Sequence, residues 1–149
     1  MSGKKFQLKK SLDYIHCFAL YHVPAYPSVR YFRLPESCAI RRHWVPLFER
    51  YSVNAAFENH DHAYKRTHPL LGDSIDPKGV VYFGDGSWGA TPRIPKRAAR
   101  TTYLAKTKSR RQYLLVELSE DTRWFQSKTA RGHIIDHYVQ EIGKPSVIK

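Results

Sequence analysis

The chain has 149 residues, of which 42% are hydrophobic and 13% are aromatic. This length and composition are typical of one folded domain and exclude a disordered protein. The net charge of +12 favours anionic partners such as phosphate esters, nucleic acid or acidic surfaces. The two cysteines, Cys17 and Cys38, belong to no C-x-x-C motif and are expected to be buried or half-buried thiols.

Neither a membrane span nor an export signal is predicted. No apolar run approaches the roughly 20 residues that cross a bilayer. The basic N-terminus, Met1 to Lys5, is not followed by the apolar segment of a signal peptide. Localisation therefore stays open.

The first half of the chain predicts a strand, a helix and a second strand. Residues 14–21 are apolar or aromatic apart from one histidine, which favours a strand buried on both faces. Over residues 38–51 the apolar positions recur with helical spacing. Ser37 is the predicted N-cap, and Pro46 is expected to kink or restart the helix. Residues 53–57 are the next predicted strand, so a parallel pair joined by a crossover helix is favoured.

The second half predicts shorter connections. A short strand over residues 80–83 enters a glycine-rich turn at 84–89. The last three strands are separated by short turns, which is typical of antiparallel hairpins. These strands are predicted at 113–118, 123–129 and 134–139.

Three of the histidines directly follow predicted strands. His22 follows the first strand, and His60 and His62 follow the second. In an extended chain, residues i and i+2 point to the same side, so His60 and His62 are predicted to face one spot. Imidazole is the commonest protein ligand for zinc and iron, and strand ends gather at one edge of an α/β sheet. These histidines therefore predict a metal site; the alternative for each is a loop histidine hydrogen-bonded to backbone.

Several segments share a pattern with one known family. Residues 55–66 resemble the G-H-x-H-A-Y-x-R motif of purple acid phosphatases and related calcineurin-like metallophosphoesterases, and residues 21–28 resemble their H-x-P-x-Y-x-S motif. Residues 81–86 and 125–136 are similar to the glycine turn and the closing hairpin of these domains. The resemblance implies an α/β (α+β) fold: half of a four-layer αββα sandwich, with a mixed sheet and C-terminal antiparallel hairpins.

The same resemblance implies a centre of two metal ions, Fe, Zn or Mn, about 3.5–4 Å apart. By position, His22 and His60 resemble ligands of one metal, and His62 resembles a ligand of the other. The metals of such a centre activate a water that hydrolyses a phosphate ester. The site residues are thus His22, His60 and His62.

Other residues near these motifs are expected to assist the site. Asn59 replaces the glycine of the motif and, with Tyr26 and Tyr64, is expected to support the metal ligands. Asp61, between two ligands, is expected to point away from the metals. Contacts to substrate phosphate are predicted for the residues that replace the family's loop histidines, Arg30, Tyr31 and Arg33.

The carboxylate motifs of the family's first half have no counterpart in the chain. No G-D-x-x followed by G-N-H is present, so residues 1–149 are interpreted as the C-terminal portion of a metallophosphoesterase domain, with at most one partial metal site. We expect little or no phosphatase activity from the isolated chain. Its unmatched apolar faces predict a complementary N-terminal half, self-association or a poorly folded remnant. Purple acid phosphatases are usually secreted.

A basic run suggests an alternative function. Residues 93–111 contain eight positive side chains and no acidic one. The simplest interpretation is a solvated loop and strand edge. The alternative is a nucleic-acid-binding module that uses the Arg93–Arg111 region, with Tyr103 and Tyr113 stacking on bases.

Overall fold

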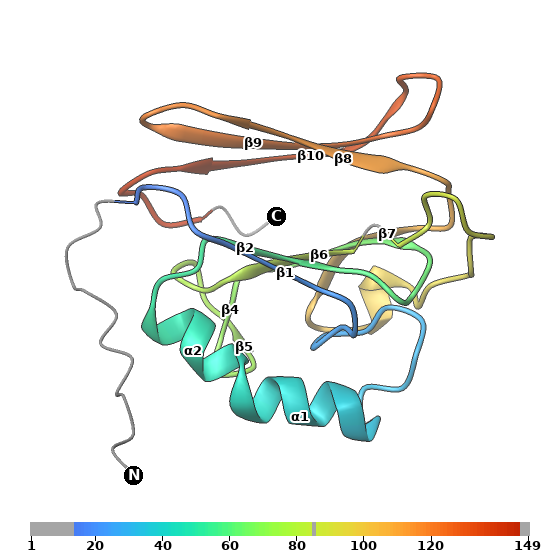
Figure 1. Ribbon diagram of the computed structural model, residues 1–149, viewed down its shortest axis with the longest axis horizontal. Coiled ribbons are helices and arrows are strands. Elements are labelled where there is room, and N and C mark those ends of the chain that lie inside the picture. The colour runs from blue at the N-terminus through green and yellow to red at the C-terminus, as the bar shows by residue number, and fades with distance from the viewer. Residues whose placement is uncertain (1–13, 85, 147–149) are drawn as a thin grey trace, which may run out of the picture.

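A computed structural model describes residues 14–84 and 86–146, so the basic N-terminus, Met1 to Lys5, lies outside the described residues. The described part forms three layers: two helices, a five-stranded sheet and a three-stranded sheet (Figure 1). This is a mixed α+β fold with a mixed sheet and antiparallel hairpins, as the sequence predicted. No helix in this part of the chain is long and apolar enough to cross a membrane.

The five-stranded sheet has the strand order β1-β2-β6-β3-β7. The first three strands are parallel, β3 pairs with β6 in the antiparallel direction, and β7 pairs antiparallel with β3, so it runs parallel to the first three. The parallel β1–β2 pair with an intervening helical segment confirms the predicted crossover. The strands are β1 (Phe18–Tyr21), β2 (Ala55–Glu58), β3 (Tyr64–Thr67), β6 (Val81–Gly84) and β7 (Leu104–Lys108).

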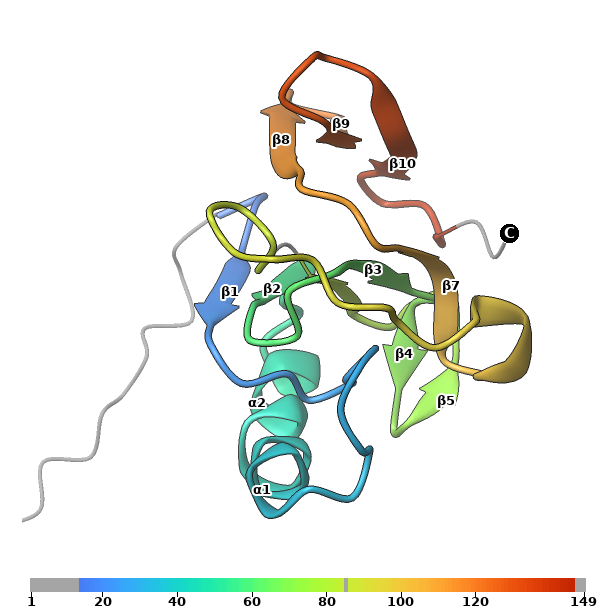
Figure 2. The same cartoon turned by 90° about the vertical axis from the view of Figure 1, so that its right-hand side faces the viewer.

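The three-stranded sheet is a continuous antiparallel meander of order β10-β9-β8, which confirms the predicted hairpins. A small hairpin, β4–β5, lies on the same side of the large sheet as the helices (Figure 2). These elements are β4 (Leu70–Leu71), β5 (Ser74–Ile75), β8 (Tyr113–Leu118), β9 (Thr122–Lys128) and β10 (Ile134–Glu141), with a 3-10 turn, η1, at Ala98–Arg100.

The predicted helix is in fact two helices, α1 (Pro35–His43) and α2 (Val45–Arg50). Pro46 lies in the first turn of α2, so the predicted restart is correct. The predicted N-cap is wrong, because Ser37 is buried inside α1. The helix begins instead at Pro35, whose fixed φ and missing N–H suit the first helical position.

β1 is shorter than predicted and is not buried on both faces. It lies at the edge of the large sheet, where Leu20 is 77% exposed. An edge strand has one neighbour only, so part of each face lacks cover. Cys17 and Cys38 are free and half-buried, as expected.

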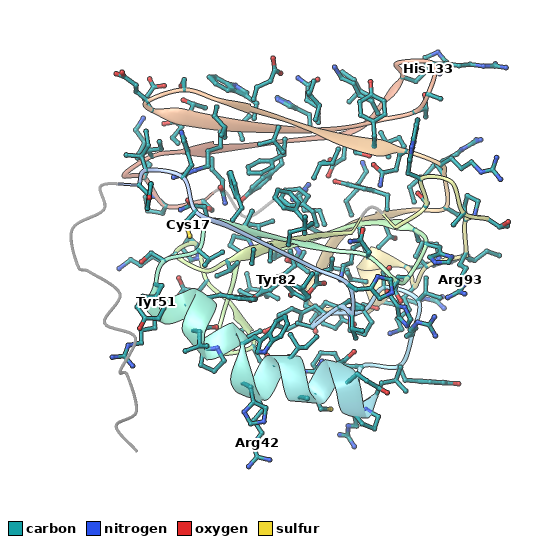
Figure 3. The ribbon with its side chains drawn as sticks, in the orientation of Figure 1. Cys17, Arg42, Tyr51, Tyr82, Arg93 and His133 are labelled. Carbon is teal, nitrogen blue, oxygen red and sulfur yellow. The ribbon has the colours of Figure 1, made fainter. Side chains whose placement is uncertain are left out.

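Two hydrophobic cores lie on opposite faces of the large sheet. Tyr82, which Figure 3 labels, packs with Tyr26 in the core on the helical side. Phe83 of β6 stacks on Phe125 of β9, with ring centroids 4.7 Å apart, in the core between the two sheets. Alternating side chains of β2 and β6 supply both cores, which explains why these strands have few polar residues.

β3 and β7 were not predicted as strands, because their sequences are rich in cations. In β3, Lys65 and Arg66 are buried, and each has a carboxylate partner: Glu58 for Lys65 and Asp136 for Arg66. The Tyr64 hydroxyl also donates to Asp136, at 2.7 Å. Since Asp136 belongs to β10, this buried polar group joins the two sheets.

Candidate metal centre

His22 and His60 lie side by side because their strands are parallel neighbours. Tyr21 pairs with Glu58 in register at the carboxyl ends of β1 and β2. His22 comes one residue after β1 and His60 two residues after β2. The Asn59 N–H donates to the His22 carbonyl at 3.1 Å, which holds the two loops together. The carboxyl ends of parallel strands are where α/β sheets place their ligand sites.

The two imidazoles face each other. His22 Nε2 is 2.9 Å from His60 Nδ1, and the ring centroids are 4.7 Å apart at an interplanar angle of 71°. In this arrangement one ring donates a hydrogen bond and the other accepts it, so the accepting nitrogen directs its lone pair at the N–H of the other ring. Two imidazole nitrogens on one tetrahedral zinc, at about 2.0–2.1 Å each, lie about 3.3 Å apart. To hold one metal ion, the two nitrogens would separate by about 0.4 Å and the donating ring would carry its proton on its other nitrogen.

The loop that carries His60 is not extended. His60 and His62 have φ values of 60° and 53°, in the left-handed region. The prediction that both imidazoles point to one side of an extended chain is therefore wrong. Residues other than glycine rarely adopt this backbone conformation outside turns. Its energetic cost must be balanced by surrounding contacts.

Two such contacts hold the histidine loop. A Cβ on Gly86 would lie 3.0 Å from both Asn59 C and His60 N, so a larger residue there would require the backbone of the histidine loop to shift. Asp61 is 1% exposed and accepts backbone N–H bonds from Ser28 and Val29, at 2.5 and 2.9 Å. Asp61 thus points into the loop after β1 and ties together the two segments that carry histidines.

A buried ion pair lies directly beneath this edge. Glu58 and Lys65 have no side-chain exposure and contact each other. Glu58 also accepts hydrogen bonds from the Tyr21 hydroxyl and from the Ala25 N–H, the latter at 2.7 Å. Burial and the Glu58 carboxylate raise the pKa of Tyr21 far above its ordinary value, so its hydroxyl stays a donor. These bonds fix the ends of both histidine-bearing strands.

The electrostatics favour a neutral imidazole at His60. Partial burial, the Arg30 guanidinium and His22 together lower the pKa of His60. A neutral imidazole is the form that binds a metal ion.

Of the three predicted phosphate contacts, Arg30 is the one whose charge contributes to the lowered pKa of His60. The Arg30 Nε atom is buried without a hydrogen-bond partner and is 3.9 Å from Asp61 Oδ1, and the side chain is 31% exposed. Tyr31 is 82% exposed, and Arg33 is also exposed. Within residues 14–84 and 86–146, the side chains of Tyr31 and Arg33 make no hydrogen bond or ion pair.

The sequence did not point to Arg93 as part of this site. The Arg93 N–H donates to the His62 carbonyl at 2.9 Å, and its Nη1 is 3.5 Å from the His60 carbonyl. Figure 3 shows Arg93 on the loop after β6. Only the tertiary fold brings this first residue of the basic run to the histidines.

Tyr26 and Tyr64, predicted to support the site, are both buried behind it. The Tyr26 carbonyl accepts a bond from Lys65, and its hydroxyl donates to Asp73 at 2.6 Å. Tyr64 points toward Asp136 at the second sheet. Neither tyrosine hydroxyl bonds to a histidine. Tyr26 is connected to the end of β2 through Lys65, which contacts both the Tyr26 carbonyl and Glu58.

In the described part of the chain, no three His, Cys, Asp or Glu side chains are grouped closely enough to hold a metal ion. His22 and His60 fit the nitrogen side of a metal centre, as their mutual distance indicates. His62 belongs to the same loop but does not complete a three-ligand group there.

Comparison with known proteins supports a phosphatase-like fold. No family profile matches the chain. Over 33 residues, 22% of this chain, it is 48% identical to the uncharacterized proteins MT2654 and Rv2577 of Mycobacterium tuberculosis, and it spans 6% of their length. The purple acid phosphatase PPD1 from yellow lupin seeds superposes on 83% of the chain with a TM-score of 0.67 and 16% identity, and the match spans 24% of that protein. The chain therefore has the fold of one portion of a purple acid phosphatase.

Proposed function

We propose that this chain provides the histidine-bearing part of a metal-dependent phosphate ester hydrolase. The observation that carries the proposal is the His22–His60 pair, whose nitrogens are 2.9 Å apart at the carboxyl ends of adjacent parallel strands. The purple-acid-phosphatase-like fold supports the same assignment. The nucleic acid alternative rests on a different surface of the molecule.

In this proposal His22 and His60 bind one metal ion, and His62 binds a second one in the complete domain. A bound metal, Fe, Zn or Mn, supplies a Lewis acid and an activated water for attack on phosphorus. The part of this chain is to hold neutral imidazoles in place. The lowered pKa of His60 and the bonds of Asp61 and Glu58 support that role.

Arg30 is the best candidate to hold the substrate phosphate. Its side chain is 31% exposed, so the guanidinium would donate to a phosphate oxygen, while its buried Nε lies 3.9 Å from Asp61 Oδ1 without a hydrogen bond. Tyr31 and Arg33 are exposed on the same loop and would contact the outer part of a phosphate ester. A partly buried guanidinium favours dianionic monoesters because it neutralises charge where water is partly excluded.

A complementary segment would complete the centre with carboxylates. β1 is an edge strand, and Leu20 on it is 77% exposed. Beside His22 lies an apolar hollow whose walls include Ile40 and Trp44. An unpaired strand edge next to an apolar surface is suited to pairing with a further strand. We propose that a carboxylate-bearing half of the same domain type adds to β1, and that the chain alone has little or no phosphatase activity.

Zinc binding tests the proposal. The chain is stripped with a chelator, and zinc binding is measured by titration calorimetry for the unsubstituted chain, His60→Ala and the matched control His137→Ala. His137 is exposed on β10, away from the histidine pair. We expect about one zinc per chain, with an affinity that is unchanged in the control and falls in His60→Ala by at least the roughly 10–100-fold typical for loss of an outer-shell partner.

Equal zinc binding by His60→Ala and the unsubstituted chain would contradict the assignment, as would no binding by any of the three. Hydrolysis of p-nitrophenyl phosphate by the zinc-loaded chain tests the second part. Efficient turnover would show that the complementary half is not required.

A further inference from the structure

A second polar surface lies along β7, the edge strand farthest from β1 in the large sheet. A groove of about 1000 Å³ separates β7 from the turn between β9 and β10, on the side of the molecule that carries His133 (Figures 1 and 3). The segment that crosses from the first sheet to the second, residues 109–112, closes its end. The cations of this basic groove are Lys106, Lys108, Arg110, Arg111 and Arg131.

These cations are exposed and have no acidic partner. None of the ion pairs formed between described residues involves any of them. No Asp or Glu lines the groove. Lys106 and Lys108 are two apart on β7 and therefore project to the same side of the sheet. Like charges gathered in a concave surface focus a positive potential and attract an extended anion.

The groove joins two distant parts of the sequence. Four of its cations belong to the basic run 93–111, but Arg131 comes from the β9–β10 turn. Two other cations of the run point elsewhere: Arg93 contacts the histidine loop, and Lys96 contacts the Arg30 carbonyl. The interpretation of the whole run as one solvated loop is therefore too simple.

An exposed aromatic pair flanks the groove. Trp88 is 62% exposed and Tyr113 is 37% exposed, and their rings meet edge to face with centroids 5.9 Å apart. The loop that carries Trp88 is bound to the crossing segment: Ser87 Oγ donates to the Arg110 carbonyl at 2.7 Å, and Arg111 Nε donates to the Ala90 carbonyl at 3.3 Å.

Tyr103, the other residue predicted to stack on bases, is not available for that role. It is partly buried against Phe32 and Tyr26, and its hydroxyl donates to the Pro27 carbonyl at 2.7 Å. Trp88, which the sequence did not single out, takes its place beside Tyr113.

We propose that the basic groove binds single-stranded nucleic acid. The five cations would follow the phosphate backbone, and the open face of Trp88 would stack on a base. This combination of an unpaired basic groove and an exposed aromatic side chain selects nucleic acid over polyphosphate, which has no bases. The proposal does not depend on the metal centre, since the two sites share no residue.

The first test measures the charge component. Anisotropy of a labelled single-stranded DNA of about 12 nucleotides is titrated with the chain at several salt concentrations. The variant Arg110→Gln/Arg131→Gln removes two charges from the groove, and Arg42→Gln/Arg50→Gln removes two from the helical face (Figure 3 labels Arg42). For the groove variant we expect roughly tenfold weaker binding and a salt slope smaller by about 1.4, at about 0.7 per phosphate contact.

The helical-face variant should bind the DNA nearly as tightly as the unsubstituted chain, because charges farther than about 8–10 Å from the ligand are screened. Equal losses in both variants would mean that net charge alone causes binding, and would overturn the proposed groove.

The second test measures the stacking component. Trp88→Leu should weaken DNA binding by about tenfold, whereas Trp88→Phe, which keeps a ring, should lose much less. Inorganic polyphosphate serves as a base-free competitor and should bind equally well to all three proteins. If Trp88→Leu binds the DNA as tightly as the unsubstituted chain, the groove accepts any polyanion and the nucleic acid assignment is wrong. His60→Ala should bind the DNA normally, which separates this test from the metal centre.

Discussion

The histidine edge, at the carboxyl ends of β1 and β2, and the β7 edge of the large sheet use their polar residues in opposite ways. At the histidine edge, charged residues such as Glu58, Lys65 and Asp61 are buried and fully paired. At the β7 edge, the cations of the basic groove are exposed and unpaired. One edge fixes the positions of two imidazoles, and the other produces a positive potential.

This difference follows from what each ligand requires. A metal ion needs nitrogens at defined positions, so its site depends on a rigid support beneath it. A nucleic acid backbone is bound mainly through charge, which tolerates mobile side chains. The comparison therefore predicts that substitutions at the histidine edge change stability strongly, whereas substitutions in the groove change binding and leave stability almost unaltered.

The largest effect is expected for Lys65→Met. The substitution leaves Glu58 buried without its cationic partner, and breaking a buried ion pair in this way costs about 3–5 kcal/mol. Urea denaturation gives the change in the free energy of unfolding. The double variant Glu58→Gln/Lys65→Met is the control, since it leaves no buried charge and should recover part of the loss. A loss below about 1 kcal/mol, the value of a surface pair, would show that this edge is not the rigid region described above.

A smaller effect is expected for Asp61→Ala. The buried carboxylate accepts backbone N–H bonds from Ser28 and Val29, and its removal leaves these donors without a partner. We expect a loss of about 2–3 kcal/mol in the free energy of unfolding. The loop that carries Arg30 should also exchange its amide protons faster. Asp61→Asn is the matched control and should lose less, because it keeps one acceptor; an equal loss in both variants would argue that charge, and not the hydrogen bonds, holds the loop.

The smallest effect on stability is expected in the groove. Arg110→Gln/Arg131→Gln removes two exposed, unpaired charges from a chain with a net charge of +12. The free energy of unfolding should change by less than about 0.5 kcal/mol, toward greater stability if anything, because repulsion between like charges is reduced. Thermal unfolding at low and high salt measures this change. A large loss would mean that the two arginines are structural, and the contrast between the two edges would disappear.

The sequence predicted the strands that have an apolar or alternating pattern and missed those that do not. β2 and β6 were found because they are apolar on both faces. The strands of the second sheet were found because apolar side chains alternate along them. β3 and β7 were missed because Tyr-Lys-Arg-Thr and Leu-Ala-Lys-Thr-Lys have too many cations for an apolar pattern. In β3 those cations are neutralised by residues 7 and 70 positions away, which no local pattern contains.

By itself the sequence determined the parallel β1–β2 unit, the hairpins and the placement of His22 and His60 after neighbouring strands, because strand order and periodicity are local properties. Only the tertiary structure decided the left-handed turn at His60 and His62, the approach of Arg93 to the histidine loop, and the union of Arg131 with the basic run. The physical reason is that these features depend on contacts between residues far apart in the chain. This holds for a strained backbone of positive φ, for a buried ion pair and for the positive potential of a groove.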